Sequence, residues 1–142
     1  MPRVPSQLRA LVRDRANDIC EYCRMPQRLY GSPFHTDHIV ALKHHGLTEA
    51  QNLAWACFHC NLAKSCNLAG VDVRTGRKVF LFNPRRHRWN RHFRWDGPVL
   101  VGRTPIGRAT VEVLNINDIL YVQTREALIG EGLFPPLETG DA

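Results

Sequence analysis

Apolar residues recur along the chain at intervals that predict short helices and short strands rather than long elements of either kind. Near the start, the apolar positions from Leu8 to Ile19 follow roughly helical spacing, and Ser6 is expected to cap this helix. The helix is predicted to end near residues 17–18 and to deliver Cys20 to the segment that follows.

Strand signals dominate the middle of the chain. Residues 34–42 and 52–56 are predicted strands, and a loop or a short turn of helix is expected over 47–51. A helix is expected over 61–68 and is predicted to stop at Gly70, because glycine tolerates the left-handed backbone of a helix end. The pattern therefore predicts two strands followed by a helix.

The second half of the chain is predicted to hold short strands and two helices. The alternation over 109–113 leaves a strand as the alternative for the first of these helices. The predicted elements are a turn at Gly76, a short buried strand over 79–82, a turn and strand over 95–102, a helix that begins at Thr104-Pro105 and a helix capped by Asn117 that runs to Leu128. Together with the first half, this is an α+β fold.

The composition is that of a folded protein without a membrane span. Hydrophobic residues make up 44% of the 142 positions and charged residues 23%. No stretch approaches the roughly 18 apolar residues that a spanning helix needs, and residues 1–7 hold no apolar signal-peptide core. A cytoplasmic protein is therefore expected, in which five cysteines indicate metal binding rather than disulfides.

Positive charge is concentrated in one segment. The net charge of +6 favours a polyanionic partner, and no acid lies between Asp72 and Asp96. Most of the interleaved aromatic residues are expected to pack in the core, whereas this many arginines repel one another unless a phosphate backbone neutralises them. The basic residues of the segment are Arg74, Arg77, Lys78, Arg85, Arg86, Arg88, Arg91 and Arg94. The predicted phosphate contacts are Arg85, Arg86, Arg88 and Arg91.

Two Cys-x-x-Cys pairs predict a structural zinc site. Each pair places two sulfurs on one tight turn, and four thiolates make a closed tetrahedral site without an open position for catalysis. Cys66 has no partner in this spacing and is expected to be a small buried hydrophobe. His59 lies inside the second pair and is an alternative ligand while the four cysteines remain the first choice. The predicted zinc ligands are Cys20, Cys23, Cys57 and Cys60.

The residues between and beside the cysteines resemble the signature of the HNH nucleases. The resemblance covers roughly residues 17–68, and the region over 77–132 is similar to the tail of some bacterial HNH proteins, many of them cyanobacterial. The matching segments are Cys20-Glu-Tyr-Cys23, Asp37-His38-Ile39, Asn52-Leu53 and Cys57-Phe-His-Cys60-Asn61-Leu-Ala-Lys64. The resemblance implies a ββα-metal (His-Me finger) core with a zinc knuckle over residues 1–70 and a basic extension over 71–142 that packs on it.

The resemblance also implies a role for each residue of the signature. His38 is the expected general base, since a neutral imidazole can take a proton from water. Asp37 and Asn61 are the expected ligands of a divalent cation, and their hard oxygens favour Mg²⁺ or Mn²⁺. Asn52 is expected to hold the loop beside His38, and Lys64 to bind phosphate. Asn61 stands where the family often has histidine.

The leading hypothesis is a Mg²⁺- or Mn²⁺-dependent endonuclease that cuts DNA, held mainly through the backbone of the double helix. The alternatives are a zinc-dependent nucleic-acid-binding module without catalysis and an auxiliary subunit of a larger nuclease or defence assembly. DNA against RNA, nicking against double-strand cleavage, sequence specificity, pathway, oligomeric state and the role of the extension are left open.

Overall fold

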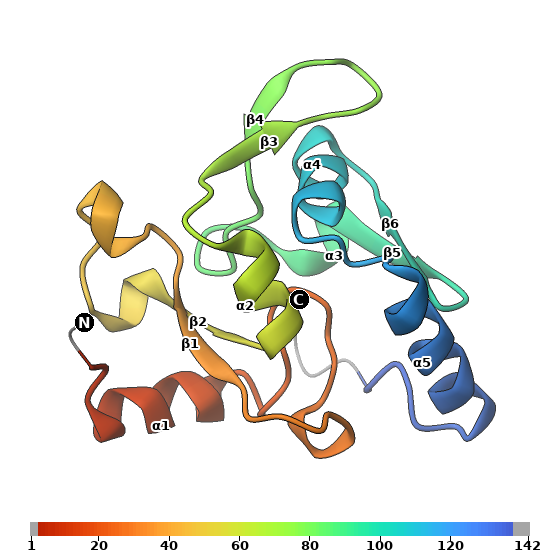
Figure 1. Ribbon diagram of the computed structural model, residues 1–142, viewed down its shortest axis with the longest axis horizontal. Helices are drawn as coiled ribbons and strands as arrows, with labels where there is room; N and C mark the ends of the chain where they lie inside the picture. The colour runs from red at the N-terminus through yellow and green to blue at the C-terminus, as the bar shows by residue number, and fades with distance from the viewer. Residues whose placement is uncertain (1–2, 138–142) are drawn as a thin grey trace.

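The computed structural model describes residues 3–137, which form a mixed α+β protein with three short antiparallel hairpins (Figure 1). The predicted fold class is confirmed. The strands are β1 (His35–His38) with β2 (Leu53–Ala56), β3 (Ala69–Val71) with β4 (Lys78–Phe80), and β5 (Phe93–Asp96) with β6 (Val99–Gly102). The helices are α1 (Ser6–Arg15), α2 (Phe58–Lys64), α3 (Trp89–His92), α4 (Pro105–Val113) and α5 (Ile119–Gly130), with 3₁₀ turns at Gln27–Leu29, Leu42–His44 and Ala50–Asn52.

Helix α1 begins one residue earlier than a Ser6 cap allows. Ser6 is the first helical residue, and Pro5 stands at the cap position without a side-chain hydrogen bond, so the predicted cap is wrong. The fixed φ of proline already suits the entry to a helix. After Arg15, Asn17 and Asp18 adopt positive φ angles of 54° and 56°, which reverse the chain toward the first cysteine pair.

Hairpin β1–β2 is shorter than predicted, and α2 starts earlier. The register pairs His35 with Ala56 and His38 with Leu53. Helix α2 begins at Phe58 because the Cys57 Sγ atom accepts the amide of Cys60 and serves as the cap. It ends at Lys64, and Ser65 then takes a positive φ of 50°. The predicted stop, Gly70, lies instead in β3.

The second half corrects three other predictions. Helix α4 has the predicted Thr104 cap, with the Thr104 hydroxyl accepting from the Gly107 amide at 3.1 Å, so the strand alternative is wrong. Helix α5 is capped by Asp118, because the Asn117 amide is engaged by both backbone groups of Leu100. The predicted buried strand over 79–82 is an exposed β4, and burial begins only after Phe80.

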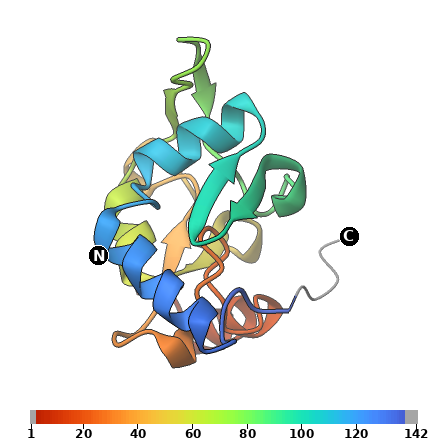
Figure 2. The ribbon, with the colours of Figure 1, turned by 90° about the vertical axis from the view of Figure 1, so that its right-hand side faces the viewer.

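One hydrophobic cluster joins the two halves. The Tyr22 and Phe82 rings meet edge to face at 6.4 Å between centroids, and the Trp89 indole N–H donates to the Tyr22 carbonyl at 2.9 Å. Figure 2 shows α4 and hairpin β5–β6 lying against the first half, with hairpin β3–β4 standing out above α4. The proposed boundary at residue 70 falls inside β3, so the extension shares its core with the segment before it.

Over residues 3–137, none of the helices combines the length and apolar character that crossing a membrane requires.

Candidate metal centre and active site

The two cysteine pairs meet in the interior. The four Sγ atoms lie within 4.8 Å of one another, and all four residues are buried. The Cys23 and Cys57 sulfurs are 3.8 Å apart, and a tetrahedron with Zn–S bonds of about 2.3 Å has S···S edges of about 3.8 Å. The cluster therefore fits a structural zinc ion held by Cys20, Cys23, Cys57 and Cys60.

Backbone amides shape each cysteine turn. The Cys23 amide points to the Cys20 sulfur at 3.5 Å, and the Cys60 amide to the Cys57 sulfur at 3.3 Å. Cys66 is half-buried and lies outside the cluster. His59 is not a ligand, because its Nε2 atom bonds the Asn115 carbonyl at 2.9 Å and its ring packs on Tyr121.

An ion pair links the knuckle to the extension. The Glu21 carboxylate accepts the Trp55 amide at 2.7 Å and also pairs with the Arg85 guanidinium. The Arg85 side chain is 13% exposed. Arg85 is thus used within the protein, and its place among the phosphate contacts is withdrawn, while Arg86, Arg88 and Arg91 lie exposed.

Asp37 points into the protein from β1. It is 4% exposed and accepts a hydrogen bond from the Tyr22 hydroxyl at 2.7 Å. The Lys64 ammonium lies 3.1 Å from one carboxylate oxygen and 3.3 Å from the other. Burial raises the pKa of Asp37, and the positive charge of Lys64 opposes that rise. The pair is therefore a buried, mutually neutralised couple.

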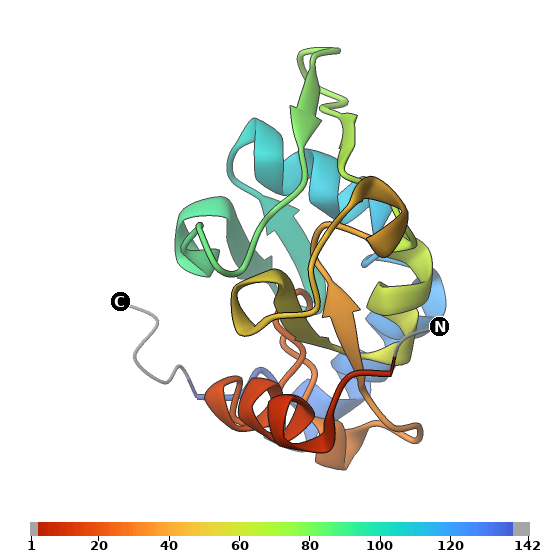
Figure 3. The same ribbon diagram turned by 90° about the vertical axis from the view of Figure 1, so that its left-hand side faces the viewer.

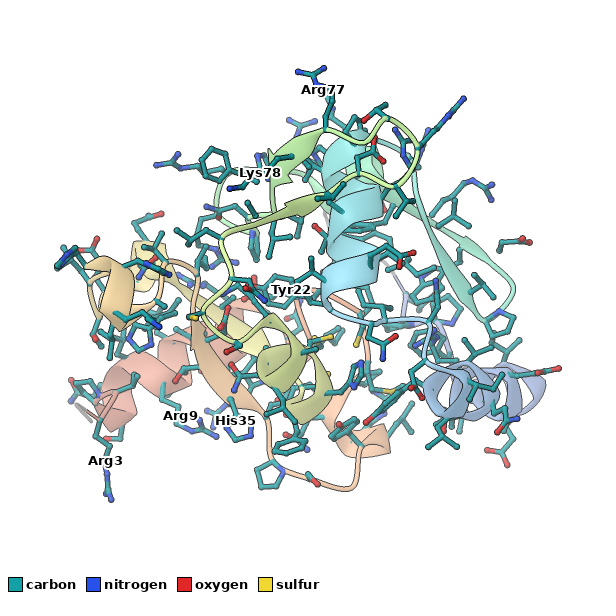
Figure 4. All side chains as sticks on the ribbon, turned by 45° about the horizontal axis from the view of Figure 1, so that its top comes forward. Arg3, Arg9, Tyr22, His35, Arg77 and Lys78 are labelled. Atoms are coloured by element: carbon teal, nitrogen blue, oxygen red, sulfur yellow. The ribbon has the colours of Figure 1, made fainter. Side chains whose placement is uncertain are left out.

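Lys64 does not face solvent as a phosphate contact would. Its side chain is 2% exposed, and the ammonium also donates to the carbonyls of His38 and Ile39, each at 3.1 Å. All of its donors thus point at oxygens of β1 and of the residue after it. Figure 4 shows the neighbouring Tyr22 in the middle of the molecule, between β1 and the extension.

His38 follows Asp37 on β1 and is half-buried. Its Nε2 atom lies 2.9 Å from the Thr48 hydroxyl. Burial lowers the pKa of His38, Asp37 opposes this effect, and Lys64 adds to it. Because the pKa lies below its usual value near 6.5, the ring is neutral at neutral pH, which is the state a general base needs.

Asn52 fixes the loop that carries Thr48. Its side-chain amide bonds the Val40 N–H at 2.9 Å, the Val40 carbonyl at 3.0 Å and the Leu47 carbonyl at 2.8 Å. A Cβ atom at Gly46 would lie 1.7 Å from the Val40 carbonyl oxygen, so the closed loop requires glycine there. The contacts are those expected of a residue that holds the loop beside His38.

Asn61 lies on α2, one turn before Lys64 and on the same face. Since Lys64 reaches Asp37, this face is turned toward β1. Asn61 is half-buried, and within residues 3–137 its side chain makes no hydrogen bond, so its amide oxygen has free lone pairs. The hard oxygens of Asp37 and Asn61 suit Mg²⁺ or Mn²⁺ in their chemistry, although Lys64 holds the Asp37 carboxylate in this arrangement.

The comparison with family profiles matches residues 20–66 to the family described as HNH endonuclease. Residues 20–66 are an HNH endonuclease family domain. The resemblance seen in the sequence is confirmed for this segment. Among the curated proteins and the solved structures, none matches the chain.

The HNH domain contains the four cysteines and all the residues described around Asp37 and His38. The exposed arginines of the extension lie outside it. Three contributors were not predicted from the sequence. Thr48 orients His38, Tyr22 binds Asp37, and Glu21 receives Arg85. Tyr22 and Glu21 stand inside the first cysteine pair, which was the one available signal, whereas Thr48 lies in a loop whose sequence has none.

Proposed function

We propose that this protein is a metal-dependent endonuclease that hydrolyses the phosphodiester bonds of DNA. The observation that carries the proposal is the His38 ring, held by Thr48 in a loop that Asn52 closes, within the segment that matches the HNH endonuclease family. A pure binding module has no need of an oriented imidazole.

His38 acts as the general base on the attacking water. When the Nε2–H group donates to the Thr48 hydroxyl, the Nδ1 lone pair is the free one and takes the water proton. Asn52 holds the loop that carries Thr48 in place. The buried Asp37 anchors β1 at the residue before His38. The orientation of the base is thus set before substrate arrives.

A divalent cation, when bound, neutralises charge on the phosphate and on the leaving oxygen. Asp37 and Asn61 would hold it, and their oxygens favour Mg²⁺ or Mn²⁺. The zinc knuckle takes no part in the chemistry and holds the start of α2, on which Asn61 stands.

DNA is the proposed substrate, held largely through its backbone. Arg86, Arg88 and Arg91 present exposed positive charge in a segment without acids. Such contacts give affinity without much sequence reading. We place the protein in the cytoplasm, where thiols stay reduced and available as zinc ligands.

The test is cleavage of supercoiled plasmid across a panel of divalent cations, with His38→Ala beside the wild type. Nicked or linear product is expected with Mg²⁺ or Mn²⁺ and none with His38→Ala, whose zinc content and circular dichroism should match the wild type. Equal cleavage by the variant removes the mechanism.

A second candidate function is zinc-dependent nucleic-acid binding without cleavage. The ion pair between Lys64 and Asp37 favours it, because the carboxylate is already neutralised. This function predicts salt-sensitive DNA binding and no nicking with any divalent cation in the same plasmid assay.

A further inference from the structure

A hollow of about 590 Å³ lies between the HNH domain and the extension. One wall is the loop between β1 and β2, and the other is the segment from β4 to α3; Figure 3 shows these two walls facing each other below hairpin β3–β4. The residues that matter here are Phe80, Arg86 and His87 on the extension side, His45 and Gln51 on the loop side, and Asn67 between them. The volume lies in the range of about 300–1,000 Å³ that ligands of nucleotide size occupy.

Phe80 stands exposed at the rim of this hollow. It is 72% exposed, which is unusual for a large aromatic side chain on a strand. Gly70 and its strand partner Val79 face α4, where a Cβ atom on Gly70 would press on Val113. Alternation therefore turns Phe80 and Lys78 to the outer face of the hairpin.

The hairpin that carries Phe80 is held firmly. Asp72 is fully buried and accepts bonds from the Arg108 guanidinium at 2.7 and 3.1 Å, and from the Thr75 hydroxyl at 2.7 Å. Arg108 belongs to α4, so the base of the hairpin is tied to the body of the protein. The strand that carries Phe80 is thus held against the body of the protein, and exposing this ring gains nothing for stability.

Charge around the hollow is uneven. Arg86 is exposed and, within residues 3–137, makes no side-chain hydrogen bond or ion pair. Lys78 stands next to Phe80 on the outer face, and Figure 4 shows Lys78 and Arg77 projecting from the hairpin. Glu49 lies on the loop side. A phosphate is therefore favoured on the extension side, near Arg86, and disfavoured on the loop side.

We propose that this hollow binds an unpaired nucleotide of the nucleic-acid substrate. The base stacks on Phe80, its phosphate lies toward Arg86, and the amide side chains of Gln51 and Asn67 are available to its edge. An aromatic face can stack only on a base that is not already stacked between neighbours in a duplex. The site therefore selects single-stranded or locally opened nucleic acid.

The proposal rests on the proposed function, because the loop that forms the wall of the hollow also carries Thr48, the partner of His38. A nucleotide bound in the hollow would contact the same loop that orients the His38 ring. The inference adds a preference for unpaired nucleotides to an activity otherwise expected on duplex DNA.

The experiment is fluorescence anisotropy with a labelled single-stranded oligodeoxynucleotide and with the duplex of the same sequence, without added Mg²⁺ or Mn²⁺. Phe80→Ala should weaken single-strand binding by roughly 5- to 150-fold and leave duplex binding unchanged. Phe80→Trp should retain the affinity. Arg86→Ala should weaken binding and lower the slope of its salt dependence by about one. Val73→Ala is the matched control, since Val73 is also exposed on this hairpin and does not line the hollow.

Equal affinities of wild type, Phe80→Ala and Phe80→Trp would overturn the proposal, as would an equal loss on duplex. A wild-type dimer that Phe80→Ala converts to a monomer in sedimentation would also overturn it, because Phe80 would then be covered by a second copy. The plasmid assay separates the two proposals. If cleavage requires His38 but single-strand binding does not depend on Phe80, the nucleotide site is wrong and the nuclease function stands. If binding requires Phe80 but no cleavage occurs, the nuclease function is wrong and the nucleotide site stands.

Discussion

The Lys64 ammonium lies 3.1 Å from the Asp37 carboxylate, and the two side chains are 2% and 4% exposed. The same carboxylate is the proposed ligand of the divalent cation. The Lys64 ammonium and a divalent cation would therefore compete for the buried Asp37 carboxylate. Under the proposed function, the outcome of this competition decides whether the domain binds the divalent cation.

Replacing Lys64 should make stability depend on divalent cations. Lys64→Met leaves Asp37 buried without a counterion, which should cost about 3–5 kcal/mol of unfolding free energy in metal-free buffer. Mn²⁺ should restore part of this loss, because the carboxylate becomes open to it. Urea unfolding with and without Mn²⁺ measures both effects.

The matched control for this variant is the pair Asp37→Asn and Lys64→Met in one chain. It removes both charges, so it should be more stable than Lys64→Met alone and indifferent to Mn²⁺. If Lys64→Met responds to Mn²⁺ no more than the wild type does, Lys64 and the metal do not share Asp37.

Removing the Thr48 hydroxyl should slow cleavage without unfolding the protein. Thr48→Val keeps the shape of the side chain but deprives the His38 Nε2 atom of its partner. A drop of about 10- to 100-fold in the single-turnover rate is expected, on the scale seen when a group that orients a functional histidine is lost. Thr48→Ser should retain most of the rate, and a slow Thr48→Ser would show that the methyl group matters rather than the hydroxyl.

Stability should fall as the pH drops below about 6.5. Burial lowers the pKa of His38, His87 and His92 in the folded protein. Below the usual histidine pKa of about 6.5, the unfolded chain therefore binds more protons than the folded one. The contribution of these histidines to the free energy of unfolding is complete above that pH and is lost progressively below it. Urea unfolding at pH 7.5, 6.5 and 5.5 checks the slope.

His92→Gln should make this slope shallower, because the variant lacks a buried ring whose pKa is lower in the folded state than in the unfolded one. Val73→Ala is the control, because Val73 is exposed and carries no titratable group. A wild-type stability that is flat over this range would show that the three histidines titrate alike in both states.

Removing zinc should abolish cooperative unfolding. The cluster ties the first cysteine turn to the start of α2, and structural zinc ions contribute on the order of 10 kcal/mol to the folding of small domains. Cys57→Ser should lose bound zinc and its thermal transition. Cys66→Ser should keep both, because Cys66 lies outside the cluster; loss of zinc from that variant would mean that the ligand set is different.

The features predicted correctly from the sequence are those fixed by local spacing. Two Cys-x-x-Cys pairs locate the cluster, and Thr104-Pro105 locates the start of α4. Caps were mistaken by one position at Ser6 and Asn117, because a polar residue beside the true cap looks the same in sequence. For Asn117 the deciding contact is with Leu100, 17 positions away.

Charge pairing could not be predicted from the sequence. Lys64 and Arg85 are both predicted from the sequence to bind phosphate, yet each is paired with a carboxylate within the protein. Their partners, Asp37 and Glu21, are 27 and 64 positions distant. Which cations remain free is a property of the folded arrangement. Of the four predicted phosphate contacts, Arg86, Arg88 and Arg91 are exposed and therefore able to meet a substrate.

The shared core has a consequence for the stability of the HNH segment on its own. A chain cut after residue 70 would expose the Tyr22 ring, which packs on Phe82, and would strip Glu21 of its counterion Arg85. We therefore expect the HNH segment alone to be less stable than the whole chain. A protein that contains this segment without the extension would need another aromatic ring to cover Tyr22 and another guanidinium to pair with Glu21.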